Sequence, residues 1–397
     1  MNTPAPTFQP VSKDALASIG TDPVPVAPYV DPAYFALEKE AIFKNTWIQI
    51  GHTCEVPHAG DFILRPFEAG DTSVLITRAE DNEIRAFHNV CPHRGTQIVS
   101  ESEGHKTRFS CPYHGWTFSN QGDLIVAPDA QQFYIDPKSC QLPHIHVGVA
   151  AGFIFINLTD EPEQTLEEYL GDLLPQLERL PHAHATHFTE YVYEVNANWK
   201  LTYDNFQENY HLRFIHPRSG AAAGGPENPF GYPTEYGFHD PHRTQRIWSN
   251  PNAKASDFQA FAFGKGARFV LEQGYSLEEK QYFGVFPNLF ILSTAMTPFS
   301  QWILPITADR TRSIIRLYWV GADQNASHRF AREFAMVSAL DIHSEDRAVI
   351  EAGHRGLASG ALSHIHFQAQ EVLCRHLFNQ VDQRVRKYQA GLGVGRS

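Results

Sequence analysis

Two short loops that carry the same kinds of metal-ligating side chain constrain this 397-residue chain most strongly. The first loop places Cys91 and His93 around a proline, and the second places Cys111 and His114 three residues apart, again with a proline after the cysteine. Seventeen residues separate His93 from Cys111. Each loop offers one thiolate and one imidazole, so we predict that both loops converge on one metal centre in a small, loop-rich domain.

Two sulfur and two nitrogen ligands are the set that a Rieske [2Fe-2S] cluster requires. In that cluster, two thiolates hold one iron and two imidazoles hold the other, which raises the reduction potential above that of an all-thiolate cluster. A structural zinc site also uses two Cys and two His, but zinc fingers more often place both Cys in one half and both His in the other. Because each loop here is mixed, the sequence favours the cluster. A cysteine nucleophile would leave the second loop unexplained.

The composition indicates a folded protein with an acidic surface. Hydrophobic residues make up 42% of the chain and charged residues 19%, which allows two domains with a sizeable core. A net charge of -12 argues against nucleic-acid and anionic-membrane partners. No secretory signal is visible, and the most apolar run, residues 147–158, is too short to span a bilayer. We expect a cytoplasmic protein in which Cys54, Cys140 and Cys374 are buried thiols.

The sequence pattern predicts three parts and an α+β fold. Residues 1–45 are expected to form an N-terminal arm and a helix, capped by Asp31, that packs on the catalytic domain. Residues 46–160 contain short β-like pieces between turn residues, which predicts a small antiparallel β domain. Residues 161–397 mix strands and helices and form the predicted catalytic domain.

Several elements of this third part are predicted from its periodicity. A Glu-rich segment at 160–181 is expected to be helical and exposed, and the stretch 220–251, rich in Gly, Pro, Asn and Asp, is expected to be a long loop that borders a substrate entrance. Strands are predicted at 187–196, 282–290 and 313–320, and helices at 199–212, 328–352 and 364–388.

A second group of candidate metal ligands follows Trp199. If residues 199–212 form one helix, Asp204, Glu208 and His211 share one face, because they stand four and three residues apart. His216 cannot reach that face by continuing the helix, but a residue before proline avoids the helical region and can fold back. Two histidines and one carboxylate form the facial triad of iron(II) oxygenases, which leaves positions open for oxygen and substrate.

The carboxylate of such a triad is expected on the helix near residue 340. Asp341, Glu345 and Asp346 are the candidates, and their spacing alone does not choose between them. Asp341 and Asp346 each share a stripe with apolar residues, so either is compatible with an acid that faces the interior. A buried carboxylate is costly unless it has a metal or a basic partner.

Taken together, the motifs resemble those of the large (alpha) subunit of the Rieske non-haem iron oxygenases, the aromatic-ring-hydroxylating dioxygenase family. The resemblance covers residues 47–376 and is strongest at the two metal motifs, with Arg94-Gly95 and Gly115-Trp116 beside the loops and Asn198-Trp199-Lys200 opening the second motif. It implies a small antiparallel β Rieske domain and a catalytic domain whose antiparallel sheet is covered by helices, a helix-grip-like arrangement.

The resemblance also assigns ligands. It implies that Cys91, His93, Cys111 and His114 hold the [2Fe-2S] cluster. It implies that His211 and His216 hold a mononuclear Fe(II). Because Glu345-Asp346 precedes an Arg-Gly-Leu run, as in the family, the resemblance selects Asp346 as the third ligand, and Asp341 and Glu345 are expected on a solvated face or in a salt bridge.

Two acids near His211 receive supporting roles. By resemblance, Glu208 is the acid that bridges a histidine of this iron to a Rieske histidine of the neighbouring subunit, which implies electron transfer between subunits of a homo-oligomer, usually a trimer. Asp204 is expected to orient the helix or His211. Many ring-dihydroxylating members have Asp at the position of Glu208, whereas Glu occurs in members that resemble carnitine and betaine oxygenases. The substrate class therefore stays open.

The predicted function is that of a terminal oxygenase, an oxidoreductase of EC class 1.14, which hydroxylates a small organic and preferably aromatic substrate with O2. Because no flavin or nicotinamide fingerprint occurs in a suitable context, electrons are expected from a separate reductase, with or without a ferredoxin, and ultimately from NADH or NADPH. The alternatives are a Rieske monooxygenase that performs oxidative N- or O-demethylation of a quaternary ammonium or methylated aromatic substrate, and a non-catalytic zinc-containing ligand-binding protein. Regiochemistry, the number of oxygen atoms inserted and the presence of a beta subunit stay open.

Overall fold

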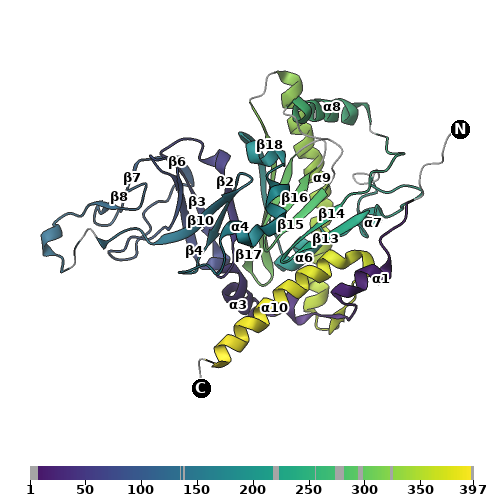
Figure 1. Ribbon diagram of the computed structural model, residues 1–397, viewed down its shortest axis with the longest axis horizontal. Helices are drawn as coiled ribbons and strands as arrows, with labels where there is room; N and C mark the ends of the chain where they lie inside the picture. Colours follow the sequence, from purple (N-terminus) through teal and green to yellow (C-terminus); the bar gives the residue numbers. More distant parts are fainter. Residues whose placement is uncertain are drawn as a thin grey trace.

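Two antiparallel sheets of seven strands form the framework of the described chain and lie next to each other (Figure 1). The computed structural model describes residues 8–134, 136, 139–217, 223–254, 256–272, 281–293, 298–321 and 325–394. The first sheet has the strand order β2-β11-β10-β5-β4-β3-β6, and the second has the order β12-β18-β17-β16-β15-β14-β13. Helices accompany the second sheet, so the predicted α+β fold class is confirmed.

The first sheet is built from short strands separated by tight turns. A small sheet of three strands, in the order β7-β8-β9, lies at the outer end of this half of the molecule (Figure 1). The strands of the first sheet are β2 (Ile48–His52), β3 (Asp61–Phe67), β4 (Thr72–Arg78), β5 (Ile84–His88), β6 (Glu103–His105), β10 (His144–Ala150) and β11 (Phe153–Asn157). Those of the small sheet are β7 (Arg108–Ser110), β8 (Thr117–Ser119) and β9 (Leu124–Val126).

The second sheet is larger and carries the long helices. Helix α6 (Trp199–Asp204) contacts β17 and β18, α9 (Ala326–Ala358) contacts β12, and α10 (Val372–Val394) contacts α6. Helix α8 (Asp257–Glu272) lies against α9 (Figure 1). The strands are β12 (His187–Val195), β13 (Glu235–His239), β14 (His242–Arg246), β15 (Gln281–Val285), β16 (Leu289–Ser293), β17 (Phe299–Thr307) and β18 (Arg310–Trp319).

The N-terminal segment begins a helix where the sequence predicts one. Asp31 accepts a hydrogen bond from the backbone N–H of Ala33 at 2.8 Å and caps α3 (Pro32–Glu38). The chain continues through a π-helical segment, Lys39–Phe43, and both pieces contact α10.

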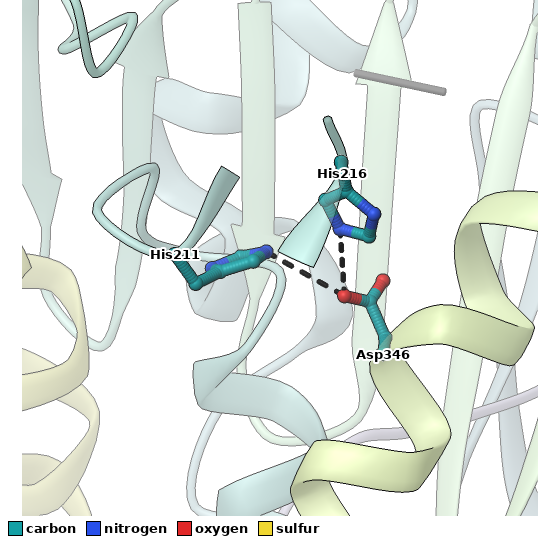
Figure 2. Close-up of side chains that lie close together, drawn as sticks. All are labelled: His211, His216 and Asp346. Carbon is teal, nitrogen blue, oxygen red and sulfur yellow. Dashed lines mark ion pairs between the residues drawn. The ribbon is translucent and has the colours of Figure 1, made fainter. Parts of the chain in front are cut away.

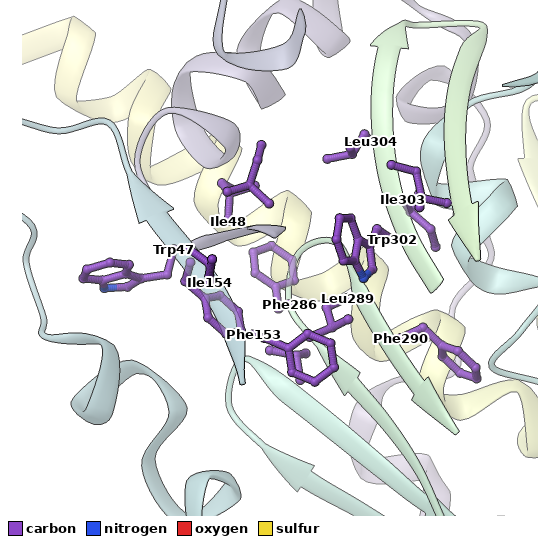
Figure 3. Packing of buried hydrophobic residues seen from close by; sticks show 14 of the residues in the cluster. Trp47, Ile48, Phe153, Ile154, Phe286, Leu289, Phe290, Trp302, Ile303 and Leu304 are labelled. Atoms are coloured by element: carbon purple, nitrogen blue, oxygen red, sulfur yellow. The ribbon is translucent and has the colours of Figure 1, made fainter. Parts of the chain in front are cut away.

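One hydrophobic core joins the two large sheets. Figure 3 shows Ile48, Phe153 and Ile154 of the first sheet beside Leu289 and Trp302 of the second, and each is at most 1% exposed. Full burial of such a side chain contributes about 1.5–3 kcal/mol to folding. Because this core crosses between the sheets, the predicted domain boundaries at residues 45 and 160 stay a prediction.

Polar contacts between the sheets accompany this core. The backbone N–H of Gln49 donates to Oδ1 of Asn288 at 3.0 Å, and Nδ2 of Asn288 donates back to the carbonyl of Gln49 at 2.8 Å. Arg316 of β18 also donates to Glu55 of the first half at 2.7 Å, and both side chains are at most 3% exposed. The backbone N–H and carbonyl of Gln49 have these partners only when both halves are folded.

Two predicted elements are wrong in ways that matter for the site. The helix predicted at 199–212 ends at Asp204, because Phe206 and Gln207 form hydrogen bonds to residues three positions earlier and the chain turns. The loop predicted at 220–251 contains the β13–β14 hairpin, in which all five residues of β14 are polar, so that this strand lacks the apolar pattern by which strands are recognised. Residues 218–222 lie outside the described part of the chain.

The strand predicted at 282–290 is interrupted by a turn, because β15 ends at Val285 and β16 begins at Leu289. Other predicted elements differ mainly at their ends. The helix predicted at 328–352 is α9, and the one predicted at 364–388 begins as α10 after a short 3₁₀ turn. The Glu-rich segment contains the short helices α4 (Leu166–Leu170) and α5 (Leu174–Leu177). Within the described residues, no helix combines the length and the apolar character needed to cross a membrane.

Candidate functional site

The two Cys-and-His loops have the same backbone conformation. The first follows β5 and the second joins β7 to β8. The N–H of Gly95 donates to the carbonyl of Cys91 at 2.9 Å, and the N–H of Gly115 donates to that of Cys111 at 3.0 Å. Gly95 and Gly115 have φ angles of 76° and 71°, in the left-handed region that favours glycine. The Gly residues beside the loops in the sequence therefore close two equivalent turns.

These turns bring the four predicted cluster ligands together. Cys91 and Cys111 are 1% and 3% exposed, and the imidazole centroids of His93 and His114 lie 4.5 Å apart. Burial and the neighbouring Cys111 thiol raise the pKa of the Cys91 thiol. Nδ1 of His114 is buried without a hydrogen-bond partner in the described part of the chain. This donor set fits a [2Fe-2S] cluster.

The second group of predicted ligands also converges, and Figure 2 shows it. Oδ1 of Asp346 lies 2.8 Å from Nε2 of His216 and 3.5 Å from Nε2 of His211. One ligand atom from each of the three residues lies within 4.8 Å of the other two. Asp346 and His216 are 2% and 1% exposed, respectively. Two imidazole nitrogens and a carboxylate in this arrangement fit a mononuclear iron(II) with open positions.

The local backbone explains how two histidines five residues apart reach one point. His211 and His216 flank the short helix α7 (Leu212–Ile215). His216 has φ -113° and ψ 51°, so it leaves the helical conformation immediately before Pro217, as the sequence predicts. Asp346 comes from the middle of α9, far along the chain (Figure 2). The long helix therefore brings the distant carboxylate to the histidine pair.

A further carboxylate holds each histidine from its other ring nitrogen. Glu208 Oε1 pairs with Nδ1 of His211, and Oε2 of Glu345 lies 2.7 Å from Nδ1 of His216. These contacts turn the Nε2 atoms toward Asp346, which is the usual role of carboxylates behind metal-bound histidines. Burial lowers the pKa of His216, but its hydrogen bonds with Asp346 and Glu345 outweigh burial and raise that pKa overall. Sequence spacing gives no signal for the Glu345 contact, since it joins residues 129 positions apart.

Asp204 has a different neighbourhood from Glu208. Its Oδ2 accepts a hydrogen bond from the Tyr29 hydroxyl at 3.4 Å, and its Oδ1 accepts one from Nε2 of Gln207 at 3.3 Å. Burial raises the pKa of Asp204 to about 8. Among the described residues, no hydrogen bond joins Asp204 to His211. Its contacts instead tie the end of α6 to the N-terminal segment, so Asp204 supports the helix rather than the ligand.

Comparison with known families agrees with this geometry. Residues 183–387 match the ring hydroxylating alpha subunit (catalytic domain) family, and residues 46–145 match the Rieske [2Fe-2S] domain. The chain therefore belongs to the family of Rieske oxygenase alpha subunits, with a Rieske [2Fe-2S] domain and a mononuclear-iron catalytic domain. The resemblance and the cofactors predicted from the sequence are confirmed.

Relatives with curated names give a finer comparison. The chain is 33% identical over 217 residues to the glycine betaine monooxygenase oxygenase subunit of Chromohalobacter salexigens, which covers 52% of this chain and 47% of that protein. It is 29% identical over 341 residues to the carnitine monooxygenase oxygenase subunit of Acinetobacter baumannii, a match that covers 83% of this chain and 84% of that protein. An N,N-dimethyl phenylurea N-demethylase subunit alpha from Sphingobium sp. is 34% identical over 195 residues, or 47% of this chain and 42% of that protein. The match to the glycine betaine enzyme thus spans about half of that relative's length.

Solved structures share the fold. The quaternary ammonium Rieske monooxygenase CntA in complex with L-carnitine has a TM-score of 0.74 at 23% identity and covers 94% of this chain and 99% of its own. Naphthalene 1,2-dioxygenase from Rhodococcus sp. bound to indole has a TM-score of 0.76 at 21% identity, and the match covers 94% of this chain and 97% of the dioxygenase chain. At these identities the likeness establishes the architecture alone.

Proposed function

We propose that this protein is the oxygenase component of a monooxygenase that oxidises an N-methylated substrate, with N-demethylation as the reaction. The observation that carries the proposal is the similarity to oxygenase subunits named for glycine betaine, carnitine and an N,N-dimethyl phenylurea. Glu208, at the position where members resembling carnitine and betaine oxygenases also have Glu, supports the same choice.

Each proposed site residue has a defined task. His211, His216 and Asp346 would hold the mononuclear iron, and Cys91, His93, Cys111 and His114 would hold the cluster. When bound, the iron provides O2 activation and the cluster provides electrons. Glu208 and Glu345 keep the two imidazoles oriented through their Nδ1 atoms.

The overall reaction balances with an external electron donor. Hydroxylation of an N-methyl carbon consumes one O2, two electrons and two protons, and yields a hydroxymethyl group and water. Loss of formaldehyde then breaks the carbon–nitrogen bond and leaves the demethylated amine. We propose that the electrons come from a separate reductase, with or without a ferredoxin, and ultimately from NADH or NADPH.

Electron transfer between copies of this chain completes the proposal. In Figure 1 the small sheet that borders the second cluster loop lies at one end of the molecule, whereas α7 and α9 lie on the other side of the two sheets. A surface hollow of about 190 Å³ opens beside Glu208, with Asp204 and Glu371 in its lining. We propose that a side chain from a cluster loop of a neighbouring copy reaches Glu208 at this hollow, in a homo-oligomer such as a trimer.

Hydroxylation of an aromatic ring, the reaction preferred from the sequence, is the second candidate. Phe206, Tyr282 and Phe290 form an aromatic group with ring centroids 5.1 Å and 5.8 Å apart. Such rings suit a flat aromatic ring and a methylated ammonium alike. The named relatives favour the N-methylated substrate, so ring hydroxylation takes second place.

Oxygen uptake with a surrogate reductase tests the proposal. We expect glycine betaine, L-carnitine or an N,N-dimethyl phenylurea to stimulate oxygen consumption and to release formaldehyde or an equivalent carbonyl product in equal amount. The protein with NADH and O2 alone should give no product. Stimulation by benzoate or naphthalene with ring hydroxylation, and none by the methylated nitrogen compounds, would instead establish the second candidate.

Variants connect this activity to the triad. Asp346→Ala and His211→Ala should abolish turnover and leave the visible absorption of the cluster unchanged, because the cluster ligands lie on other loops. Asp341→Ala is the matched control, since Asp341 is an exposed acid on the same helix. Loss of turnover in Asp341→Ala with full turnover in Asp346→Ala would show that the third ligand is wrongly assigned.

A further inference from the structure

One face of the second sheet is turned toward the metal triad. Residues directly opposite each other in an antiparallel sheet point to the same face. Arg243, Gly284, Phe290 and Gln301 form one such row across β14, β15, β16 and β17. The ring of Phe290 lies 5.8 Å from that of Phe206, which follows α6. This face therefore packs against the segments that carry the proposed ligands.

A second row on the same face leads from the metal to β14. Gln245 is opposite Tyr282, two positions along from Arg243 and Gly284. The ring of Tyr282 lies 5.1 Å from that of Phe290, and the ring of Phe206, next to Phe290, lies 4.9 Å from that of His343. His343 stands one turn before Asp346 on α9, so this aromatic group connects α9 with the β14 side of the sheet.

The side chains of β14 on this face carry polar atoms without partners. Gln245 is 1% exposed, and neither its Nε2 nor its Oε1 has a hydrogen-bond partner in the described chain. Arg243 is 0% exposed, and neither its Nη1 nor its Nη2 has a hydrogen-bond partner in the described chain. A buried amide or guanidinium without a partner is strongly unfavourable. Both side chains are therefore expected to meet a polar group that the chain itself does not supply.

The guanidinium of Arg243 is held in position from one side only. Its Nε donates to Oε1 of Gln207, and its carbon Cζ lies 4.6 Å from the ring centroid of Tyr203. A Cβ at Gly284 would lie 2.9 Å from Cγ of Arg243, so glycine at this position lets the side chain lie across β15. The remaining two nitrogens form a planar fork of donors, which matches the geometry of a carboxylate.

The charges around Arg243 do not neutralise it. None of the ion pairs of the described residues includes Arg243. The acid that influences it most is Asp204, and His242, His376 and Arg384 also lie nearby. Burial raises the pKa of Asp204, and no salt bridge joins its carboxyl to Arg243 among the described residues. The surroundings of the guanidinium therefore favour an anionic partner.

We propose that Arg243 and Gln245 bind a carboxylate of the substrate, which makes the substrate class an N-methylated ammonium compound that also carries a carboxylate. This inference rests on the proposed function and adds to it the chemistry of the far end of the substrate. The aromatic side chains Phe206, Tyr282 and Phe290 lie between β14 and the metal and contact the methylated ammonium group. The methyl carbon then faces the triad while the carboxylate occupies the fork on β14.

Binding measurements separate the two ends of the substrate. Isothermal titration calorimetry on the anaerobic protein with both metal centres would compare glycine betaine and L-carnitine with their methyl esters, in which the negative charge is absent. We expect at least one of the two acids to bind at least about tenfold more tightly than its ester. This readout does not depend on turnover.

Two variants and a control make the assignment specific. Gln245→Glu keeps the shape of the side chain and adds a negative charge, so it should weaken acid binding at least about tenfold and leave ester binding nearly unchanged. Arg243→Lys keeps a positive charge but loses the fork and should also weaken acid binding. Gln49→Glu is the control, because Gln49 is an equally buried amide with a free Oε1 in the first sheet. It should preserve the preference for the acid, and each variant should retain the cluster absorption.

The possible outcomes distinguish this inference from the proposed function. Equal binding of acids and esters by the wild-type protein, or unchanged acid binding by Gln245→Glu, would overturn the carboxylate site while the N-methyl oxidation stands. A crystal structure with substrate at the iron and only ordered water at Arg243 would do the same. If no methylated ammonium compound binds or reacts in any form, the proposed function itself fails.

Discussion

At the scale of single residues, the most informative contact is the one between Glu345 and His216. Sequence patterns place both residues near a metal motif, yet they do not identify a partner for Glu345. In the structure, Oε2 of Glu345 lies next to Nδ1 of His216, whereas Nε2 of the same ring faces Asp346. A histidine held in this way presents a fixed nitrogen to the metal and loses little orientational freedom on binding it.

Removal of this carboxylate should weaken metal binding. We expect Glu345→Ala to reduce iron affinity about 10–100-fold, because the imidazole of His216 is no longer oriented. Metal content after dialysis, or competition with a chelator, measures the effect while the cluster absorption reports folding. Asp341→Ala, an exposed acid one turn earlier on α9, should retain the wild-type affinity. Unchanged affinity in Glu345→Ala would show that this contact does not tune the site.

Asp204 gives a pH dependence of stability with a definite sign. Burial raises its pKa from 3.8 to about 8 in the folded protein. Below the unfolded pKa the carboxyl is protonated in both states, and as the pH rises toward the folded pKa only the unfolded chain ionises, so its stabilising contribution is lost across this window. We expect Asp204→Asn to melt at a temperature that exceeds the wild-type value increasingly from about pH 5 to about pH 8.

Melting curves at several pH values check this expectation. Asp341→Asn serves as the control for loss of an acidic group at an exposed position. A difference between Asp204→Asn and the wild-type protein that stays constant across the window would mean that Asp204 is ionised in the folded state.

The residues of the triad could be predicted from the sequence, whereas their supporting contacts could not. His211, His216 and Asp346 have a recognisable spacing and family pattern, and the structure brings them within 4.8 Å of each other. Arg243 and Gln245 lie in a stretch predicted as a loop, so nothing in the sequence indicates that they share a sheet face. Pairings between distant residues depend on strand register, which one sequence does not specify.

At the scale of secondary structure elements, α6 shows how a short helix can be fixed by its N-cap residue. The side chain of Asn198 accepts a hydrogen bond from the N–H of Lys200 at 3.1 Å and donates to the carbonyl of Ala308 at 2.8 Å. The helix ends after six residues, so the proposed iron ligands follow it on turns. The sequence predicts the start of this helix, but its early end depends on tertiary contacts such as those of Asp204.

Loss of this cap should destabilise the protein more than loss of an exposed one. Asn198→Ala should lower the free energy of unfolding by about 2–3 kcal/mol, because it removes the cap and leaves the buried carbonyl of Ala308 without its donor. Asn325→Ala removes the cap of α9 at an exposed site and should cost about 1 kcal/mol. Denaturant unfolding measures both, and equal losses would contradict a structural role for the second hydrogen bond of Asn198.

At the scale of the whole molecule, the two sheets are expected to unfold together. Their side chains form one core, and Asn288 satisfies the backbone N–H and carbonyl of Gln49 across the junction. Sequence patterns predict two folded halves, because one part of the chain contains short β-like pieces and the other mixes strands and helices. They give no sign that the halves share a core, because the contacts involved join residues 239 positions apart.

A substitution at this junction tests the coupling. Asn288→Ala should lower the free energy of unfolding by about 2–4 kcal/mol, since it leaves two buried backbone groups unpaired. Visible circular dichroism of the cluster and tryptophan fluorescence should still report one common transition. Asn45→Ala, which removes one exposed hydrogen bond to Glu40, should cost far less. Separate transitions for the two signals in the wild-type protein would show that the halves are independent.

The junction between the sheets has a consequence for engineering chimaeras. An exchange of the cluster-bearing half with that of another family member would transplant one side of a complementary surface without the other. Such hybrids should fold well only when the second half supplies Asn288 for the backbone at position 49, and when Glu55 is kept together with Arg316. Evolution faces the same restriction, so the input of electrons and the choice of substrate cannot be recombined in this protein as freely as interchangeable modules.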